Sequence, residues 1–321
     1  MKPFTVFPND SNFDFMRVRW ASLGVALVLM LAAIGAIVAN GFNFALDFTG
    51  GTATELRFEQ AVDVDEIRGR LESAGLEGAQ VQTFGTGNDL LIRLQPRGGE
   101  GVDMSQVDSD TAREVQRAVS TTENPAEVLQ SGYVGPQVGR DLAINGIWAL
   151  IFVIVGFLIY ISLRFEKKFA IAAVITTLHD VVIVAGWLAL TGREFDLTVL
   201  AGVLSVMGFS INDTIVVFDR VRENFRGMRA DPVTVLNRSI NQTLSRTIIT
   251  SVVALLTMVA LYLYGGGSLE GMAESLIIGI VVGTLSSIFV ACPLLTLGML
   301  QVTKQDLMPK AKDEAALARR P

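Results

Sequence analysis

Six stretches of apolar residues, each about as long as a bilayer is thick, dominate this sequence. A helix needs about 20 consecutive apolar residues to cross the hydrocarbon core of a bilayer. The six stretches cover residues 20–39, 143–163, 169–190, 197–218, 247–264 and 272–300. Half of all residues are hydrophobic, a composition too apolar for an ordinary soluble enzyme. The sequence therefore predicts a polytopic α-helical membrane protein with six transmembrane helices.

The basic residues are divided unequally between the two sides of these spans. Lysines and arginines cluster in residues 1–19, in the 164–168 connection, in residues 219–246 and in residues 301–321. If six spans alternate, all four segments lie on one side, and the opposite short connections contain only Arg193. Because cytoplasmic loops carry the excess of lysine and arginine, we expect both termini in the cytoplasm and the long loop over residues 40–142 on the outer side of the membrane. The segment 219–246 is then a cytoplasmic loop, and 301–321 a cytoplasmic tail.

Residues 40–142, between the first two spans, are long enough to fold as a separate domain. They contain 17 acidic and 8 basic residues, so this outward-facing segment has a net charge of −9. Alternating apolar positions predict strands over 52–58, 79–84, 89–94 and 127–134. Helical periodicity predicts one helix after Asp63, with Glu66 completing a capping box and Gly75 ending it, and a second over 105–119 with Thr111, Val115 and Ala118 inward. The predicted order is βαββαβ, an α+β ferredoxin-like arrangement, joined to the spans by hinges.

One carboxylate, Asp213, lies inside the fourth apolar stretch. A charged side chain is costly at membrane depth, so such a residue is retained where function or a partner requires it. Helical spacing places Phe209, Asn212, Val216 and Arg220 on the same face as Asp213. Arg246 lies at the start of the next span, which gives an acid and a base on neighbouring helices and indicates a proton path. The alternatives are that Asp213 serves only helix packing, that Arg246 is a membrane anchor, and that Arg220 belongs to a solvated helix end.

The third span contains a second acid, Asp180, directly after the one histidine, His179. Adjacent helical residues project about 100° apart, so we do not expect these two side chains to form a tight pair. Asp180 is nevertheless a candidate for the same polar path.

Two glycine-containing segments border the predicted outer domain. Asp47, Gly50 and Gly51 follow the first span, and Gly135, Pro136 and Gly139 precede the second. Glycine permits close backbone approach and proline fixes one dihedral angle, so each segment is a candidate hinge. A rigid elbow would use the same residues.

The residue pattern lacks the signatures of common enzymes. We find no Ser/His/Asp triad, metal-ligand spacing, P-loop or dinucleotide fingerprint, and the single cysteine, Cys292, allows no intramolecular disulfide. We therefore expect no cofactor and no metal. Nucleic acid is an unsuitable partner for the acidic outer domain.

Four motifs in order resemble a known family. They are Leu46-Asp-Phe-Thr-Gly-Gly51, Val134-Gly-Pro-Gln-Val-Gly139, Phe209-Ser-Ile-Asn-Asp-Thr-Ile-Val-Val-Phe-Asp-Arg-Val-Arg-Glu-Asn224 and Ser245-Arg-Thr-Ile-Ile-Thr-Ser251. Together they are similar to the SecF branch of the SecD/SecF family, which is related to the resistance-nodulation-division exporters. The resemblance covers residues 13–300 and includes the six-span layout.

The resemblance implies a non-enzymatic subunit that pairs with SecD beside the SecYEG channel, with YajC and YidC as further partners. It implies use of the proton motive force to promote export of a polypeptide. It also associates Asp213 and Arg246 with proton passage, with Asp180, Asn212, Thr214 and Arg220 as further candidates. Two other functions are open at this point: a proton-driven exporter of small molecules or lipids, and a scaffold in which Asp213 and Arg246 only pack.

Overall fold

The computed structural model describes residues 11–76, 78–84, 88–94, 104–303 and 306. The chain divides into two compact units. The helical unit comprises Met1–Gly41, Phe152–Arg193 and Ala201–Pro321, and the α/β unit comprises Phe42–Ile151 and Glu194–Leu200. Most of the tail predicted over residues 301–321 lies outside the described residues.

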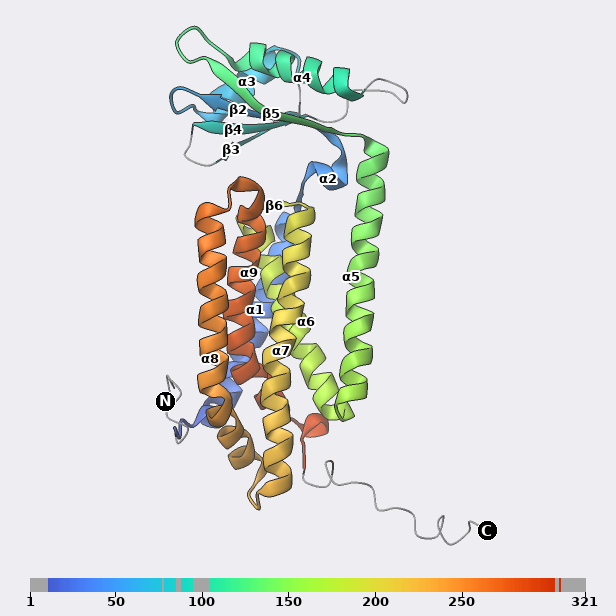
Figure 1. Cartoon of the computed structure of the whole chain (residues 1–321), viewed down its shortest axis with the longest axis vertical. Coiled ribbons are helices and arrows are strands. Elements are labelled where there is room, and N and C mark those ends of the chain that lie inside the picture. Colours follow the sequence, from blue (N-terminus) through green and yellow to red (C-terminus); the bar gives the residue numbers. More distant parts are fainter. Residues whose placement is uncertain (1–10, 77, 85–87, 95–103, 304–305, 307–321) are drawn as a thin grey trace, which may run out of the picture. The chain divides into compact units, whose positions relative to one another are not determined.

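Six helices of the described chain are long and apolar enough to cross a membrane, which confirms the predicted number of spans. They are α1 (Arg19–Asn40), α5 (Pro136–Arg164), α6 (Lys167–Thr191), α7 (Leu197–Gly227), α8 (Pro232–Tyr264) and α9 (Gly267–Ser286). A short 3-10 helix, η1 (Phe15–Val18), precedes α1, and α9 continues through a π-helical turn, η2 (Ser287–Ala291), into α10 (Cys292–Leu294). Within the helical unit α6 packs against both α1 and α9, and α8 packs against α9 (Figure 1).

The helices differ in how much of their apolar surface the chain itself covers. At least half of the most apolar part of α6, α7 and α9 is buried, against 11% or less in α1, α5 and α8. Phe169 of α6 and Phe218 of α7 pack edge to face, with ring centroids 5.2 Å apart, in the core between these helices. Apolar side chains exposed on α1, α5 and α8 therefore face lipid or another membrane protein.

Two predicted boundaries on the helical unit are wrong. The segment 219–246 was expected to be a loop, but α7 runs to Gly227 and α8 begins at Pro232, so only four residues connect them. Asp231 caps α8, accepting a hydrogen bond from Thr234 N at 3.1 Å, and proline is favoured in the first turn. The last predicted span extended to residue 300, whereas its helical part ends at Leu294 and a separate 3-10 turn, η3, covers Gly298–Leu300. Hydrophobicity marks the lipid-facing part of a helix rather than its ends.

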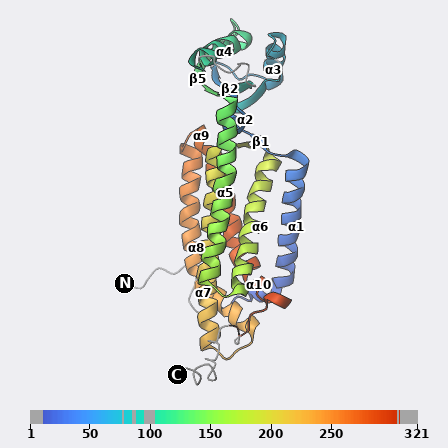
Figure 2. The same cartoon turned by 90° about the vertical axis from the view of Figure 1, so that its right-hand side faces the viewer.

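The α/β unit contains a four-stranded antiparallel sheet with two helices. Its elements are β2 (Gly51–Phe58), α3 (Val64–Ser73), β3 (Gln80–Phe84), β4 (Asp89–Leu94), α4 (Met104–Val119) and β5 (Ala126–Val134). The strand order in space is β3-β4-β2-β5, and both helices lie on one face of the sheet (Figure 2). The predicted sequence of elements therefore matches the structure.

Alternation places one side of β2 in the core of this unit. Thr54, Leu56 and Phe58 are buried as expected, and Leu56 packs with Ile67 and Leu71 of α3. Two details differ from the sequence prediction. Asp63 caps α3 through Asp65 N, while Glu66 pairs with Arg70 at 2.6 Å instead of completing a capping box. Among the described side chains of α4, the fully buried ones are Ala112, Val115 and Val119; Ala118 packs against the same core while partly buried, and Thr111 is half-buried.

Two shorter strands complete the unit. β1 (Asn43–Phe44) pairs in parallel with β6 (Glu194–Phe195), and a single helical turn, α2 (Leu46–Thr49), follows β1. Arg93 of β4 is buried and forms an ion pair with Glu194. Burial lowers the pKa of Arg93 to about 10, against the opposing effect of the negative charges of Asp196 and Asp47.

Candidate functional site

Asp213 points into the helical unit. Only 3% of its surface is exposed, and it lies on the buried side of α7. Among the described residues its one hydrogen-bond donor is Ser251 of α8, whose Oγ lies 3.4 Å from Oδ2. A hydrogen bond of this length is weak, so Asp213 is a buried acid with little compensation from its surroundings.

The hydroxyl groups next to Asp213 have alternative acceptors. Ser251 Oγ lies 2.7 Å from the Thr247 carbonyl of its own helix, and Thr284 Oγ1 of α9 lies 2.7 Å from Ser251 Oγ and 2.7 Å from the Ile280 carbonyl. Each hydroxyl carries one proton and can therefore donate to only one acceptor at a time. Rotation of these hydroxyls can direct a chain of donors toward Asp213 or away from it.

Asp180 of α6 is completely buried and well satisfied. Its Oδ2 accepts hydrogen bonds of 2.6 Å from Ser210 of α7 and of 2.6 Å from Ser286 of α9. His179 Nδ1 lies 2.9 Å from the other carboxylate oxygen. The expectation that adjacent residues would not form a close pair was wrong, because the imidazole torsions turn the ring back toward the neighbouring carboxylate.

These groups form two hydrogen-bonded sets across four helices, which together we call the polar seam: Asp180 with Ser210 and Ser286, and Asp213 with Ser251 and Thr284. Ser210 is one turn before Asp213 on α7, and Thr284 and Ser286 are close in sequence on α9. The two sets are close in sequence along α7 and along α9, but no hydrogen bond joins them among the described residues. The π-helical turn η2 starts directly after Ser286, and such turns are frequent at functional sites.

The remaining predicted path residues are placed differently. Arg246 is exposed and interacts electrostatically with Asp213, but no hydrogen bond joins the two among the described residues. Thr214 is fully buried in the same helix turn, whereas Asn212 is exposed on another face. Arg220 lies two turns away and pairs with Glu223 at 2.8 Å. The predicted common face is therefore wrong for Asn212, because the core selects Ser210, Asp213 and Val217, whereas Arg220 keeps the i+7 register with Asp213.

The two glycine segments meet within the α/β unit. A Cβ atom at Gly139 would lie 2.9 Å from Gly50 N, and both Gly50 and Gly51 have positive φ angles, of 69° and 127°. Asp47 Oδ2 accepts a hydrogen bond of 3.0 Å from Leu197 N, at the first turn of α7. Asp47 thus acts as a helix cap, a role that its sequence context did not reveal. Gly135 and Pro136 lie where β5 ends and α5 begins.

The hydroxyl residues of the seam were not predicted from the sequence. Ser210, Ser251, Thr284 and Ser286 lie inside apolar stretches, where serine and threonine commonly bond to their own helix backbone. Only the side-by-side packing of α6, α7, α8 and α9 shows which of them reach a carboxylate. Within the described ranges, no group of three or more His, Cys, Asp or Glu side chains lies close enough to hold a metal ion.

Comparison with known proteins agrees with this architecture. Residues 114–300 match the family described as "Protein export membrane protein SecD/SecF, C-terminal", and residues 35–62 match the "SecD/SecF GG Motif". The chain is 44% identical over 306 residues to protein translocase subunit SecF of Pseudomonas aeruginosa, covering 94% of this chain and 96% of that protein. It is 43% identical over 289 residues to the SecF subunit of Escherichia coli O157:H7, covering 89% and 88% of the two chains.

Solved structures give a similar result. The crystal structure of SecDF, a translocon-associated membrane protein from Thermus thermophilus, superimposes with a TM-score of 0.80 at 37% identity. It covers 92% of this chain, while this chain spans 39% of the SecDF chain. A SecDF structure in a super-membrane-facing form gives a TM-score of 0.64.

Six spanning helices with two carboxylates in a buried polar seam define a multi-pass membrane protein with a polar intramembrane core. The long, high-identity matches then identify its family. The chain belongs to the SecD/SecF family of protein export membrane proteins, which acts in the Sec pathway.

Proposed function

We propose that this chain works with SecD beside the SecYEG channel and uses the proton motive force to promote export of polypeptides across the bacterial inner membrane. In this proposal it is a transport subunit without a chemical active site. The observation that carries the proposal is Asp213, a buried acid that has one long hydrogen bond and an arginine nearby. YajC and YidC are proposed as further partners.

The energetics favour a group that changes its charge. An ionised carboxylate with only one weak donor is poorly stabilised inside a membrane, and protonation removes that cost. One elementary charge crossing the membrane potential releases about 2.3 kcal/mol per 100 mV. Protonation of Asp213 from one side of the membrane, followed by release of the proton to water on the other side when the charge of Arg246 favours the carboxylate, would therefore supply enough free energy to bias two conformations that differ by a few kcal/mol.

Asp180 is proposed as the second member of the path. Its two serine donors satisfy it, so it holds α6, α7 and α9 together in the state described here. Thr214, whose buried Oγ1 has no partner among the described residues, is available to a proton or a water on the same helix turn as Asp213. We propose that Arg220 lies at the edge of the proton path beside the solvent, and that Asn212 lies at its edge beside a helix of the partner.

A surface of α7 supports pairing with SecD. Ala201, Ser205, Gly208 and Asn212 are exposed and recur at helical spacing along one face of this helix. An exposed asparagine at membrane depth is unfavourable in lipid, whereas small residues allow a second helix to approach closely. We propose that SecD covers this face.

The distribution of charge supports a cytoplasmic location for both termini. Arg193, the one basic residue in the short connections of the opposite side, is ion-paired with Glu270 at 2.7 Å and with Glu274 at 2.5 Å. At the other end of the bundle, Arg226, Arg229 and Arg238 are exposed and form no ion pair among the described residues. The three unpaired arginines thus lie at one end of the bundle, and the positive-inside rule assigns that end to the cytoplasm.

The α/β unit is proposed to be a periplasmic domain of the ferredoxin-like class. The strand order β3-β4-β2-β5 with both helices on one face supports this class. We propose that the segments at Asp47, Gly50 and Gly51 and at Gly135, Pro136 and Gly139 act as hinges through which proton movement reaches this domain. A crosslink between this domain and the spans is expected to stop proton-driven export, and unimpaired export in the crosslinked protein would contradict the hinges.

The central test is protein export into inverted membrane vesicles with SecD supplied, with and without a proton gradient. Asp213→Asn is expected to abolish the stimulation by the gradient while leaving the protein inserted. Asp219→Asn is the matched control, because Asp219 is on the same helix but pairs with Arg164 at the exposed end. If the gradient stimulated protein export fully in Asp213→Asn, the chain would be a scaffold rather than a proton-coupled subunit. If Asp213→Asn left protein secretion unaffected but altered small-molecule efflux, the chain would be an exporter.

A further inference from the structure

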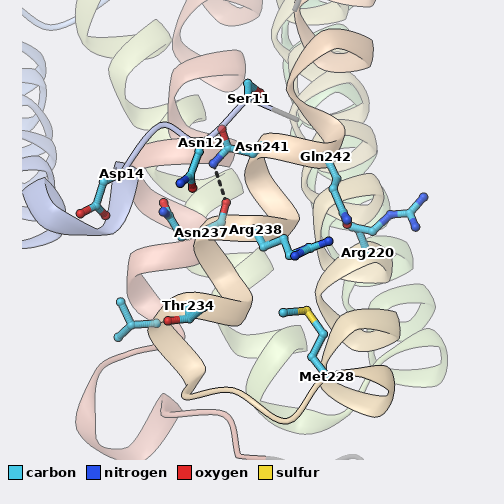
Figure 3. Close-up of a pocket in the computed structure, with 11 residues that line it drawn as sticks. Ser11, Asn12, Asp14, Arg220, Met228, Thr234, Asn237, Arg238, Asn241 and Gln242 are labelled. Carbon is cyan, nitrogen blue, oxygen red and sulfur yellow. Dashed lines mark hydrogen bonds between the residues drawn. The ribbon is translucent and has the colours of Figure 1, made fainter. Parts of the chain in front are cut away.

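A polar cavity lies at the end of the helical unit where α7 and α8 are connected. It has a volume of about 890 Å³, within the range of about 300–1,000 Å³ typical of small-molecule sites. Its walls come from the segment before η1, the last turns of α7 and the first turns of α8 (Figure 3). The polar lining residues are Ser11, Asn12, Asp14, Arg220, Thr234, Asn237, Arg238, Asn241 and Gln242.

The carboxamide oxygens of this cavity are already used by the protein. Asn237 Oδ1 accepts hydrogen bonds from the backbone N–H groups of Phe15 at 2.8 Å and Met16 at 3.4 Å. Gln242 Oε1 accepts one of 2.9 Å from Asn224 Nδ2. The amide nitrogens of Asn237 and Gln242 have no partner among the described residues. These side chains therefore offer donors, rather than acceptors, to a ligand.

The charged lining residues favour an anion. Arg238 extends from α8 between Asn237 and Gln242, and it has neither a hydrogen bond nor an ion pair in the described chain (Figure 3). Arg220 shares its charge with Glu223. Asp14 is the one acid of the lining, and its Oδ1 accepts a hydrogen bond from Arg17 N. Residues 220–246 contain six arginines and two acids, so the surrounding field is also positive.

The cavity begins at the depth of lipid headgroups. The apolar part of α8 starts at Thr247, so at 1.5 Å per residue Gln242 lies about 7.5 Å before it, whereas Arg238 and Asn237 lie about 14 and 15 Å before it, on the aqueous side. The headgroup layer on each side of a bilayer is roughly 5–7 Å thick. Arg220 follows the apolar part of α7 by two residues, which gives it a similar depth.

We propose that this cavity binds a phosphate group, that of an anionic phospholipid or that of a dissolved ion, with Arg238 and the amide nitrogens of Asn237 and Gln242 as the donors. A bound headgroup would connect the start of the chain to the α7–α8 turn, because Asn237 holds Phe15 and Met16 with its oxygen and faces the ligand with its nitrogen. The site does not depend on the proposed proton path, and free phosphate shares the same chemistry.

The test uses the full-length protein in a neutral detergent and follows its thermal unfolding. Short-chain phosphatidylglycerol is titrated against short-chain phosphatidylcholine, since a ligand that binds the folded state raises the unfolding temperature. We expect stabilisation by phosphatidylglycerol and none by phosphatidylcholine. Arg238→Gln is expected to weaken phosphatidylglycerol binding about tenfold, because a hydrogen bond to a charged group is lost. The control is Arg229→Gln, because Arg229 is an exposed arginine of the α7–α8 connection outside the cavity, and this variant is expected to bind normally.

A second variant separates binding from folding. Asn237→Asp keeps an oxygen for the backbone donors of Phe15 and Met16 but replaces the inward-facing donor with a negatively charged acceptor. It is expected to unfold at the wild-type temperature without lipid and to lose stabilisation by phosphatidylglycerol. Equal stabilisation by phosphatidylcholine, or equal weakening by Arg229→Gln and Arg238→Gln, would overturn the proposal. If inorganic phosphate at the same concentrations reproduced the whole effect, the ligand would be dissolved phosphate and the lipid assignment would fail.

Discussion

Ser210 of α7 donates a hydrogen bond of 2.6 Å to Asp180 of α6. Three residues further along α7, on the same buried side, lies Asp213. A rotation or shift of α7 that changes the surroundings of Asp213 must therefore also strain or break the Ser210 bond to Asp180. The backbone of α7 thus links the two carboxylates mechanically, and this relationship provides specific tests.

Neutralising Asp180 is expected to remove most of the stimulation of export by a proton gradient. In Asp180→Asn the side chain keeps one oxygen that accepts from Ser210 or Ser286, but its charge is gone. Export into inverted vesicles, with and without the gradient, measures the effect. Asp219→Asn again serves as the control, and undiminished stimulation in Asp180→Asn would exclude Asp180 from the path.

The serine donors of Asp180 are expected to contribute to stability. Ser286→Ala leaves a buried carboxylate with one donor fewer on Oδ2, and such a loss costs about 1–3 kcal/mol. Thermal unfolding of the purified full-length protein measures the difference. Ser205→Ala is the matched control, since that exposed hydroxyl bonds only to the Ala201 carbonyl of its own helix. Equal unfolding temperatures for the two variants would contradict a structural role for the Ser286 bond.

Ser251→Ala is expected to slow proton-driven export about tenfold, because it removes the one hydroxyl that donates to Asp213 and ends the chain from Thr284. The export rate under a fixed proton gradient is the measurement. Thr257→Val on the same helix is the control, because that exposed hydroxyl bonds only to the Val253 carbonyl. A wild-type rate in Ser251→Ala would show that the proton reaches Asp213 by another route.

Hydrophobicity and charge predicted the six spans because each span needs a continuous apolar length. Alternation predicted the βαββαβ order because β2 has one buried face, with Thr54, Leu56 and Phe58. Local patterns of this kind are set within a few residues and can be read from one sequence. The pair Asp231-Pro232 is an equally local signal. It predicts the start of α8, whereas the apolar run begins only at Thr247.

The site was less predictable because it is made by contacts between distant segments. Asp180 and Asp213 were recognised as unusual from their membrane depth alone. The hydroxyl donors of these acids were not predicted. Ser286, for example, is uncharged and lies 106 residues from Asp180 in sequence. Which face of α7 is inward depends on packing against α6 and α9, so Asn212 was placed with Asp213 although it points elsewhere.

The glycine contact in the α/β unit gives a test of close packing. Gly139→Ala would place a methyl group 2.9 Å from Gly50 N, a backbone atom that has little room to move. Overpacking of this kind costs about 1–3 kcal/mol, and we expect a corresponding fall in the unfolding temperature of the full-length protein. Gly132→Ala is the control, because a Cβ at Gly132 meets nothing within 4 Å. Equal stability of the two variants would mean that the two glycine segments do not pack closely in solution.

The cross-strand pair of Arg57 and Asp89 predicts a dependence on acid in the sheet of the α/β unit. The hydrogen bond from Arg57, 2.8 Å from Nε to Oδ1, together with its charge, lowers the pKa of Asp89, although burial acts in the opposite direction. In an unfolded chain the pKa of an aspartate is about 3.9, the value found in model peptides. Because the folded-state pKa is lower, the contribution of Asp89 to stability is complete above about pH 5 and is lost as the pH falls through the folded-state pKa.

Arg57→Gln removes the cause of that lowered pKa, so its sheet is expected to lose less stability on acidification than the wild-type sheet does. Hydrogen exchange of the β2 and β4 amides, corrected for the intrinsic effect of pH on exchange, measures this from pH 5 downward. Arg68→Gln is the control, because the Arg68 pair with Asp65 is exposed on α3 and contributes little. The same pH dependence in wild type and Arg57→Gln would show that the ion pair does not hold the two strands together, since a carboxylate without its guanidinium should titrate close to its unfolded value.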